Sequence, residues 1–449
     1  MATFAHLADW LAHLETVHKS EIDLGLTRVG QMIARLQAAS LLTLNYPIIT
    51  VGGTNGKGST CAYLEQILLA AGYKVGCHTS PHVIDFTERA RFNGVDATEE
   101  QLLPLFHAVE RVRQQAPEIS LTYFEFTLLV FMCWFDAQQP DAVILEVGLG
   151  GRLDATNVFE SAAAVITSVD IDHVGFLGDT REAIGFEKAG IFRAHQPAVC
   201  ADPNPPQSLI DHANAIGADL KLINRDFSYQ VIQDDQRKQW RFIGEHSTRN
   251  SLAMPAMRGD YQLANASAAL AALDALREQL PVTQQAVRVG ISNAVVRGRF
   301  QVLPGQPTTI LDVAHNPHAA RALAKNINQM GYAPYTHAVF GAMADKDIGQ
   351  VLRIMRDVVD HWYVCDLPSA RAATAEQLRA ILLDSGFVAD QDHSVQTFDS
   401  VQSALAHLSA SVPTQVSPND RIIIFGSFVT VEQALKGLPR FPSVPAEST

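Results

Sequence analysis

Short apolar runs alternate with longer helical patterns through the first half of the chain. Each run is bounded by polar turn residues, as expected for strands buried inside a parallel sheet. Strands are predicted over residues 47–51, 74–78, 142–147 and 163–168. Helices are predicted over residues 60–71, 99–115 and 124–138. This alternation predicts an α/β nucleotide-binding domain with a mostly parallel sheet.

A change of pattern near residue 298 indicates a second domain. Before it, residues 226–245 alternate as antiparallel strands do, and an Ala-rich helix is predicted over 260–280. Glycines and prolines then interrupt the pattern between residues 298 and 307. We therefore expect an N-terminal domain of residues 1–297 and a C-terminal domain of residues 298–449.

The C-terminal part repeats the order of strand and helix on a smaller scale. Strands are predicted over residues 308–313, 336–341, 361–365 and 421–426. Helices are predicted over residues 317–330, 346–359, 374–384 and 400–409. This order is typical of a Rossmann-like domain.

The charge balance and the apolar segments argue against several classes of protein. With 34 Lys and Arg against 47 Asp and Glu, the formal net charge of −13 disfavours a surface for nucleic acid or anionic membrane. The apolar segment 126–135 is too short to span a bilayer and predicts a buried helix, while residues 1–20 predict an amphipathic helix and not a signal peptide. The five cysteines lie far apart, which indicates reduced thiols and a cytoplasmic protein.

Residues Gly53–Ser59, with the sequence Gly-Thr-Asn-Gly-Lys-Gly-Ser, stand between a predicted strand and a predicted helix. Glycines at such a turn let backbone N–H groups point toward an anion, and the helix N-terminus adds partial positive charge. Lys57, expected to be exposed, supplies an ammonium, and the hydroxyl of Ser59 or Thr60 can reach a phosphate-bound Mg²⁺. Because Gly58 separates Lys57 from Ser59, unlike in the standard P-loop, an ordinary structural turn stays open as an alternative. The expected fold is thus α/β, with a large P-loop-type nucleotide-binding domain and a smaller Rossmann-like C-terminal domain.

Polar side chains follow three of the predicted strands at their carboxyl ends, where such sheets bind ligands. Ser80, Glu146 and His173 are the candidates, and together they could form a rim for a divalent metal. A Glu is rarely buried without a partner, so the role of a metal ligand is favoured for Glu146. The alternative is that its carboxylate caps the following loop. His173 taken alone is more often an ordinary surface or core residue.

Several longer blocks extend these motifs. They are Ser-Pro-His at 80–82, Thr-Tyr-Phe-Glu at 122–125, Leu-Glu-Val-Gly-Leu-Gly-Gly-Arg-Leu-Asp-Ala-Thr-Asn at 145–157, Glu-Lys-Ala-Gly-Ile-Phe-Arg at 187–193 and Asp-Val-Ala-His-Asn-Pro-His at 312–318. With the glycine-rich loop, they resemble the bacterial folylpolyglutamate synthases, and more narrowly the bifunctional dihydrofolate synthase/folylpolyglutamate synthases. The resemblance runs in order from Ile22 to Phe428, and the related Mur ligases share the P-loop variant.

The resemblance implies an ATP-dependent amide ligase. Such an enzyme joins L-glutamate to the carboxylate of dihydropteroate, and then to the γ-carboxylate of tetrahydrofolates, after ATP has converted the acid to an acyl phosphate. The implied cofactors are ATP and two Mg²⁺ ions. The implied partners are the small-molecule substrates, and neither nucleic acid nor a membrane is expected to bind. The protein is expected to be a monomer.

The resemblance also implies roles for individual residues. ATP would be bound by Thr54, Asn55, Gly56, Lys57, Gly58, Ser59, Asn265, Arg299 and Asp312. Mg²⁺ would be bound by Ser80, Glu146 and His173. The pterin acceptor would be bound by Asp23, Leu24, Gly25, Arg28, Thr122, Tyr123, Phe124, Glu125, Arg152, Asp154 and His315. The catalytic residues would be Lys57, His173 and Lys188.

Two of these residues have simpler interpretations. Asn316 and Pro317, beside His315, form an ordinary helix N-cap followed by proline at the first helical position. Lys188 could be a surface lysine paired with Glu187 or Glu182. The resemblance instead implies a lysine carbamylated by CO₂, whose negative charge would support a nearby Mg²⁺.

Three other functions stay open on the sequence. The chain could be a folylpolyglutamate synthase without the dihydropteroate activity, or a Mur-type ligase acting on a peptidoglycan precursor. Residues 121–125 resemble the bifunctional group more closely. A P-loop switch or binding protein without ligase activity would leave the block at 312–318 without a role.

Overall fold

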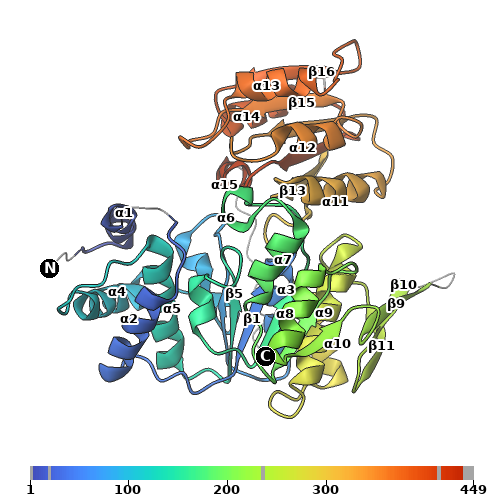
Figure 1. Ribbon diagram of the computed structural model, residues 1–449. Helices are drawn as coiled ribbons and strands as arrows, with labels where there is room; N and C mark the ends of the chain where they lie inside the picture. The colour runs from blue at the N-terminus through green and yellow to red at the C-terminus, as the bar shows by residue number, and fades with distance from the viewer. Residues whose placement is uncertain (1–3, 19–21, 234–237, 412–415, 438–449) are drawn as a thin grey trace, which may run out of the picture. The chain divides into compact units, whose positions relative to one another are not determined.

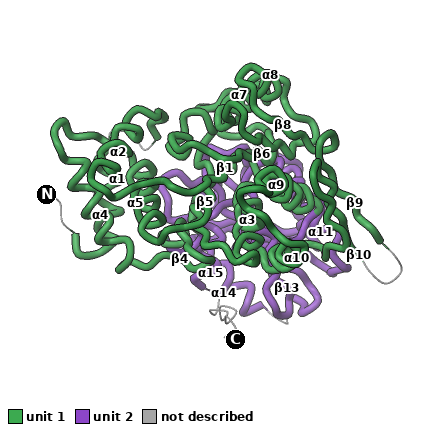
Figure 2. Tube along the Cα trace, turned by 90° about the horizontal axis from the view of Figure 1, so that it is seen from below, with its two compact units in different colours: residues 1–82, 86–256, 260–295 green, residues 83–85, 257–259, 296–449 purple. Residues whose placement is uncertain are grey.

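The computed structural model describes residues 4–18, 22–233, 238–411 and 416–437. The chain divides into two compact units, which are shown in different colours in Figure 2. The first unit comprises residues 1–82, 86–256 and 260–295, and the second comprises 83–85, 257–259 and 296–449. The sequence placed a single boundary between 297 and 298, and it did not indicate that two short earlier segments belong with the second unit.

The first unit is built on an eight-stranded sheet with the order β4-β3-β2-β5-β1-β6-β7-β8. The neighbouring strands β2, β5, β1, β6, β7 and β8 are parallel. Strands β3 and β4 pair antiparallel at the edge next to β2. The strands are β1 Ile48–Gly52, β2 Val75–His78, β3 Ala90–Phe92, β4 Val95–Asp96, β5 Ala142–Glu146, β6 Ala163–Ile166, β7 Pro197–Cys200 and β8 Asp219–Leu222. The mostly parallel sheet and its four predicted strands are confirmed, whereas β3, β4, β7 and β8 were not predicted.

Ten α-helices are described in the first unit, and Figure 1 shows their arrangement. They are α1 Leu7–Val17, α2 Thr27–Ala38, α3 Lys57–Ala70, α4 Glu99–Arg113, α5 Tyr123–Gln138, α6 Val174–Leu177, α7 Arg181–Ala189, α8 Gln207–Ile216, α9 Tyr261–Ala275 and α10 Gln284–Asn293. Helices α1, α2, α4 and α5 pack into one group, and α3, α9 and α10 into another. The prediction of a buried helix over 126–135 is confirmed, because these residues of α5 are all buried. In the part of the chain that the structure describes, no helix is long and apolar enough to cross a membrane.

A three-stranded antiparallel sheet, of order β11-β10-β9, completes the first unit. Its strands are β9 Ser228–Gln233, β10 Lys238–Ile243 and β11 Thr248–Ala253. Antiparallel strands were predicted over 226–245, and the sheet extends beyond that range. Residues 234–237 of the prediction lie outside the described residues.

The second unit contains a six-stranded sheet of order β12-β13-β17-β14-β15-β16, parallel except for β12. The strands are β12 Gln301–Leu303, β13 Thr308–Asp312, β14 Thr336–Phe340, β15 His361–Cys365, β16 Ser394–Phe398 and β17 Arg421–Phe425. The helices are α11 Pro317–Asn328, α12 Ile348–Met355, α13 Ala375–Asp384, α14 Val401–Ser411 and α15 Phe428–Gly437. The predicted strand and helix order is confirmed. Strand β16 was missed because it lies at the sheet edge and none of its residues is fully buried.

Candidate active site

The glycine-rich loop joins β1 to α3 and is shaped by two glycines. Gly53 and Gly56 have φ angles of +138° and +91°, which favour glycine, and Gly56 is the N-cap of α3. The helix therefore begins at Lys57, three residues before the predicted start, and its first N–H groups lie next to the loop. The Nζ of Lys57 donates to the carbonyl oxygens of Gly53 (3.0 Å) and Thr54 (3.3 Å). Lys57 is partly buried, so the expectation of an exposed side chain was wrong.

The loop is also fixed to the segment that follows β6. The backbone N–H of Thr54 donates to the carbonyl of Ser168 (2.8 Å), and that of Asn55 donates to the Ser168 hydroxyl (3.1 Å). The Thr167 hydroxyl donates to the carbonyl of Asn55 at 2.6 Å. These bonds hold the loop in one conformation before any ligand is present, which reduces the entropy cost of binding an anion.

Helix α9 brings Asn265 to the loop from a distant part of the sequence. A Cβ on Gly56 would lie 2.5 Å from the Asn265 side-chain oxygen, so the two residues touch. One turn earlier, Gln262 donates to the Ser59 hydroxyl at 3.3 Å and accepts from the Asn265 amide at 3.2 Å. Sequence reasoning missed Gln262. Its spacing of three residues from Asn265, on an Ala-rich helix, is the signal that could have found it.

The carboxyl ends of β2 and β5 place Ser80 and Glu146 together. Glu146 is only 3% exposed, and its Oε2 accepts from the backbone N–H of Ser80 at 3.0 Å. A Cβ on Gly58 would lie 3.8 Å from the same oxygen, so this carboxylate adjoins the glycine-rich loop. The buried hydroxyl of Thr60 has no hydrogen-bond partner among the described residues. Carboxylate and hydroxyl oxygens of this kind fit a hard divalent cation.

His173 differs from Glu146 in its exposure to solvent. It is the N-cap of α6, has a φ of +51°, and carries an exposed side chain. Among the described residues, no three His, Cys, Asp or Glu side chains form a preassembled metal cluster. The expected metal ligands are Ser80, Glu146 and His173. Only Glu146 and His173 are of those four residue types, because Ser80 would bind the metal through its hydroxyl.

Lys188 is buried near the end of α7, with an exposed fraction of 4%. Burial, and then the nearby charge of Lys57, lowers the pKa of Lys188 to about 7, against the opposing effect of Asp172 and Asp154. The alternative of a surface lysine is therefore wrong.

The two carboxylates that a surface Lys188 would pair with have other partners. Glu187 pairs with Arg152 at 2.7 Å. Glu182 accepts from the backbone N–H groups of Gln207 and Ser208.

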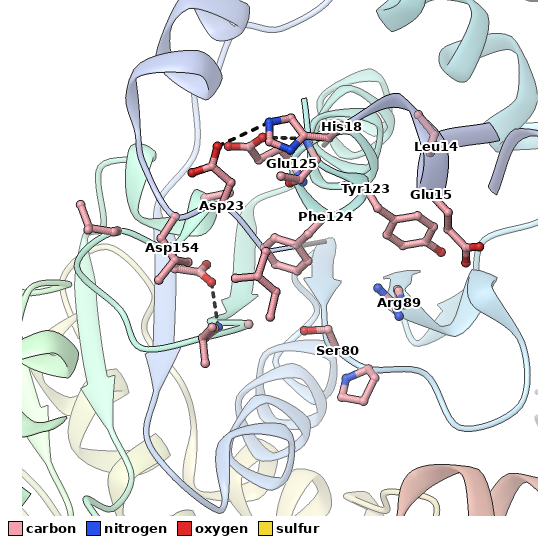
Figure 3. Close-up of a pocket in the computed structure, with 18 of the residues that line it drawn as sticks. Leu14, Glu15, His18, Asp23, Ser80, Arg89, Tyr123, Phe124, Glu125 and Asp154 are labelled. Atoms are coloured by element: carbon pink, nitrogen blue, oxygen red, sulfur yellow. Dashed lines mark hydrogen bonds and ion pairs between the residues drawn. The ribbon is translucent and has the colours of Figure 1, made fainter. Parts of the chain in front are cut away.

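A cavity of about 650 Å³ opens in the first unit beside Ser80 (Figure 3). Among the expected acceptor-binding residues, those that line it are Asp23, Leu24, Thr122, Tyr123, Phe124, Glu125 and Asp154. Gly25 does not line the cavity but donates its backbone N–H to Leu153 at 3.1 Å, which ties the entry segment to the cavity wall. Sequence reasoning assigned no role to His82 and Arg89, which also line it, although His82 belongs to the Ser-Pro-His block at 80–82.

Two of the cavity carboxylates already hold parts of the protein. Glu125 belongs to the capping box of α5 with Thr122 and accepts from Arg28 at 3.0 Å, while Arg28 also pairs with Asp23 at 2.7 Å. Asp154 accepts from Leu149 (2.8 Å) and from the Thr156 hydroxyl (2.6 Å). These bonds oppose the effect of burial, which raises the pKa of Asp154. Both carboxylates thus shape the cavity wall.

Arg28 and Arg152 do not line the cavity, although both were expected to contact the acceptor. Arg28 acts on the wall through its ion pairs. Arg152 pairs with Glu187, and its guanidinium lies 5.6 Å from the ring of Phe186. Within the first unit, the structure therefore joins Arg152 to α7 and not to the cavity.

Three expected site residues lie in the second unit, around the carboxyl end of β13. Asp312 is buried and accepts from the backbone N–H groups of Phe300 and Ala314, both at 2.8 Å. Burial raises the pKa of Asp312, and the charge of Arg299 opposes this. The Nδ1 of His315 lies 2.9 Å from the carbonyl oxygen of Val313.

The adjoining residues have the structure that the simpler interpretation predicts. Asn316 caps α11 by accepting from the backbone N–H of Ala319 at 2.9 Å, and Pro317 is the first helical residue. Arg299 lies with its guanidinium 5.3 Å from the ring of Phe428. The loop that carries His315 is thus firmly held at the start of α11.

The fold and these sites define a two-part, nucleotide-dependent ligase of the Mur type. Residues 51–273 match the Mur ligase middle domain, and residues 298–428 match the glutamate ligase domain of Mur ligases. A dihydrofolate synthase/folylpolyglutamate synthase of Escherichia coli is 41% identical over 96% of this chain and 95% of its own length.

Solved structures give the same result. That of E. coli FolC in complex with DHPP and ADP has a TM-score of 0.87 at 40% identity, covering 97% of this chain and 98% of that one. A bifunctional folylpolyglutamate synthase/dihydrofolate synthase with Mn, AMPPNP and L-glutamate bound has a TM-score of 0.85 at 40% identity, covering 96% and 98%. The chain belongs to the dihydrofolate synthase/folylpolyglutamate synthase family of Mur ligases.

Proposed function

We propose that this protein forms dihydrofolate and folylpolyglutamates with one nucleotide site and one acceptor cavity. It is an ATP-dependent ligase that adds glutamate to dihydropteroate and to folates. One observation carries the proposal of a shared site. Ser80 lines the acceptor cavity and binds Glu146, and Glu146 adjoins Gly58 of the phosphate loop. An acceptor acid in the cavity can therefore end beside a bound nucleotide.

The order of the reaction follows from the chemistry of a carboxylate. A carboxylate is a poor electrophile, so its oxygen first takes the γ-phosphoryl group of ATP, and ADP leaves. The amine of L-glutamate then attacks the acyl phosphate and displaces inorganic phosphate, with loss of a proton from the nitrogen. We assign to Lys57 and the N–H groups of residues 54–59 the task of stabilising charge on the transferring phosphoryl group.

The divalent metal is assigned to Ser80, Glu146 and His173. Relatives bind a metal together with a nucleotide, as the structure with Mn and AMPPNP illustrates. When bound, Mg²⁺ would neutralise phosphate charge. Of the three residues, Ser80 and Glu146 are already in contact through a hydrogen bond, and His173 would complete the set from its exposed turn. We propose two Mg²⁺ ions per active site.

Lys188 is assigned as a carbamylated lysine. Carbamylation needs a neutral amine, which attacks CO₂ to form an N–C bond and releases one proton. Burial favours the neutral amine, and a pKa of about 7 leaves a large part of it unprotonated at neutral pH. The resulting anion would also remove the repulsion between Lys188 and Lys57.

The carbamate can be tested without an activity assay. The protein is incubated with ¹³C-labelled bicarbonate, and the carbamate carbon is sought by NMR in the wild type and in Lys188→Ala. We expect one carbamate signal that the variant lacks and that weakens as the pH falls below about 7, because the amine then becomes protonated. Lys188→Ala should be nearly inactive, with partial rescue by small carboxylic acids. An unchanged signal in the variant contradicts the assignment.

The remaining ATP contacts are assigned to Asn265, Arg299 and Asp312, and His315 is assigned to the acceptor side with the cavity residues. Tetrahydrofolates, dihydropteroate and L-glutamate are the proposed substrates. We further propose that the protein acts as a monomer in the cytoplasm.

The function is tested by coupled release of ADP. Dihydropteroate and tetrahydrofolate are supplied as separate acceptors, each with and without L-glutamate. Glutamate-dependent ADP release with both acceptors supports the bifunctional activity, whereas release with tetrahydrofolate alone indicates a folylpolyglutamate synthase only. Release without any acceptor indicates a P-loop ATPase and overturns the proposal.

A further inference from the structure

Arg89 lines the acceptor cavity and has no role in the function proposed so far. It ends a short 3-10 helix, Phe86–Arg89. Its Nε donates to Nδ1 of His82 at 2.9 Å. Its guanidinium lies 5.7 Å from the ring of Phe86 and 5.6 Å from the ring of Tyr123. Aromatic faces on the guanidinium fix its plane without using its remaining N–H donors.

Arg89 differs from the neighbouring arginines in its charge balance. Arg28 pairs with two carboxylates, and Arg91 pairs with the buried Glu65 at 2.9 Å. Within the described ranges, no carboxylate forms an ion pair with Arg89, although Glu15 lines the same cavity. Burial lowers the pKa of Arg89, and a phenol, Tyr123, is the main opposing influence. A partly buried guanidinium of this kind favours an anionic ligand.

The position of Arg89 indicates which part of a ligand it meets. Arg89 and Tyr123 stand across the cavity from Asp23 and Asp154, with Ser80 nearby (Figure 3). Its partner His82 is two residues from Ser80, which binds Glu146. Arg89 therefore lies toward the end of the cavity at which the acceptor carboxylate is activated.

The two acceptors differ in charge at that end. Dihydropteroate has one carboxylate, which the reaction consumes. A folate ends in glutamate, so its γ-carboxylate reacts while its α-carboxylate stays charged and must be held. We propose that Arg89 is a specificity-determining residue that binds the α-carboxylate of the glutamyl tail of folate acceptors. This inference rests on the proposed function and assigns a residue to only one of its two reactions.

Steady-state kinetics with both acceptors tests the inference. In Arg89→Gln, kcat/KM for tetrahydrofolate should fall about 10- to 100-fold, the usual effect of losing a charged hydrogen-bond pair. For dihydropteroate it should change by less than about threefold, since no α-carboxylate is present. Arg89→Lys should lie between the two because it keeps the charge but not the paired N–H groups. The ratio of the two values is measured within one variant, so it does not depend on the fraction that is folded.

Two controls separate recognition from structure. Arg35→Gln removes a partly buried arginine that bonds only to carbonyl oxygens outside the cavity, and it should leave the acceptor ratio unchanged. A tetrahydrofolate whose α-carboxylate is replaced by a carboxamide should react poorly with the wild type, and Arg89→Gln should reduce its rate little further. Equal losses with both acceptors, or no loss, overturn the inference. A wild type inactive with both acceptors would instead refute the proposed function.

Discussion

Single side chains in this site act through the backbone groups that they organise. Lys57 illustrates this, because its ammonium donates to two carbonyl oxygens of the loop that its own helix follows. It therefore stabilises the loop to which we assign the phosphate groups of ATP. Asp312 and Asp154 also accept backbone N–H groups, so their removal would disturb structure as well as binding.

Lys57→Ala should lower kcat by at least about 100-fold, because a cation that stabilises the transferring phosphoryl group is lost. The thermal unfolding midpoint should change little, since the loop keeps its bonds to Ser168. Turnover of ATP with tetrahydrofolate and glutamate is the measurement. Lys74→Ala, at an exposed lysine of the same unit, is the control and should retain full activity. Near-normal turnover of folded Lys57→Ala would exclude this loop as the catalytic nucleotide site.

Helices set the position of the phosphate loop by close packing. Helix α3 carries the loop at its N-terminus and is held by α9 and α10. At Gly290 of α10, an added Cβ would lie 2.5 Å from the Cα of Ile67 in α3. The absence of a side chain at this position is therefore what allows the two helices to approach.

Gly290→Ala should lower the free energy of unfolding by about 1–3 kcal/mol, as overpacking of a close contact does. It should also raise the KM for ATP, because α3 must shift. Chemical denaturation and ATP-dependent kinetics are the measurements. Gly349→Ala places the same substitution in α12 with its nearest atom at 3.9 Å, so stability should be unchanged or higher. Equal effects of the two substitutions would contradict the packing argument.

Strands β14 and β15 of the second unit carry a buried polar group that makes stability depend on pH. His337 stacks on His361 at 4.8 Å and contacts Asp420 at 3.1 Å and Tyr363 at 3.3 Å. Burial lowers the pKa of His337 from 6.5, against the opposing effect of Asp420, and burial also lowers that of His361. The unfolded chain therefore binds more protons than the folded chain as the pH falls below about 6.5.

It follows that the free energy of unfolding should decrease as the pH falls from 7.5 to 5.5. In His337→Gln this decrease should be smaller, whatever the absolute stability of the variant, because one of the titrating groups is gone. Urea denaturation at both pH values measures the difference. A decrease of the same size in both proteins would show that His337 does not contribute.

At the scale of the whole molecule, the residues assigned to ATP belong to both compact units. The phosphate loop and Asn265 belong to the first unit, and Arg299 belongs to the second. Arg299→Gln should raise the KM for ATP about tenfold, because a cation assigned to the nucleotide is lost while Asp312 keeps its backbone bonds. Arg353→Gln, at an exposed arginine of α12, should leave the KM unchanged. An unaltered KM in Arg299→Gln would contradict the assignment of Arg299 to ATP.

The sequence by itself determined the order of the strands and helices that it predicted in both units, because buried strands and amphipathic helices impose local periods on apolar residues. It also determined the glycine-rich loop, since glycine adopts the positive φ angles that the loop requires without steric cost. Strand β16 escaped it because it lies at the sheet edge and none of its residues is fully buried, and the sequence did not indicate β3, β4, β7, β8 or β12 either. Only the tertiary structure decided that Lys188 is buried, that Gln262 and Asn265 reach the loop, and that Arg89 faces the acceptor cavity. Burial and charge pairing depend on residues far apart in the chain, so no local pattern contains them.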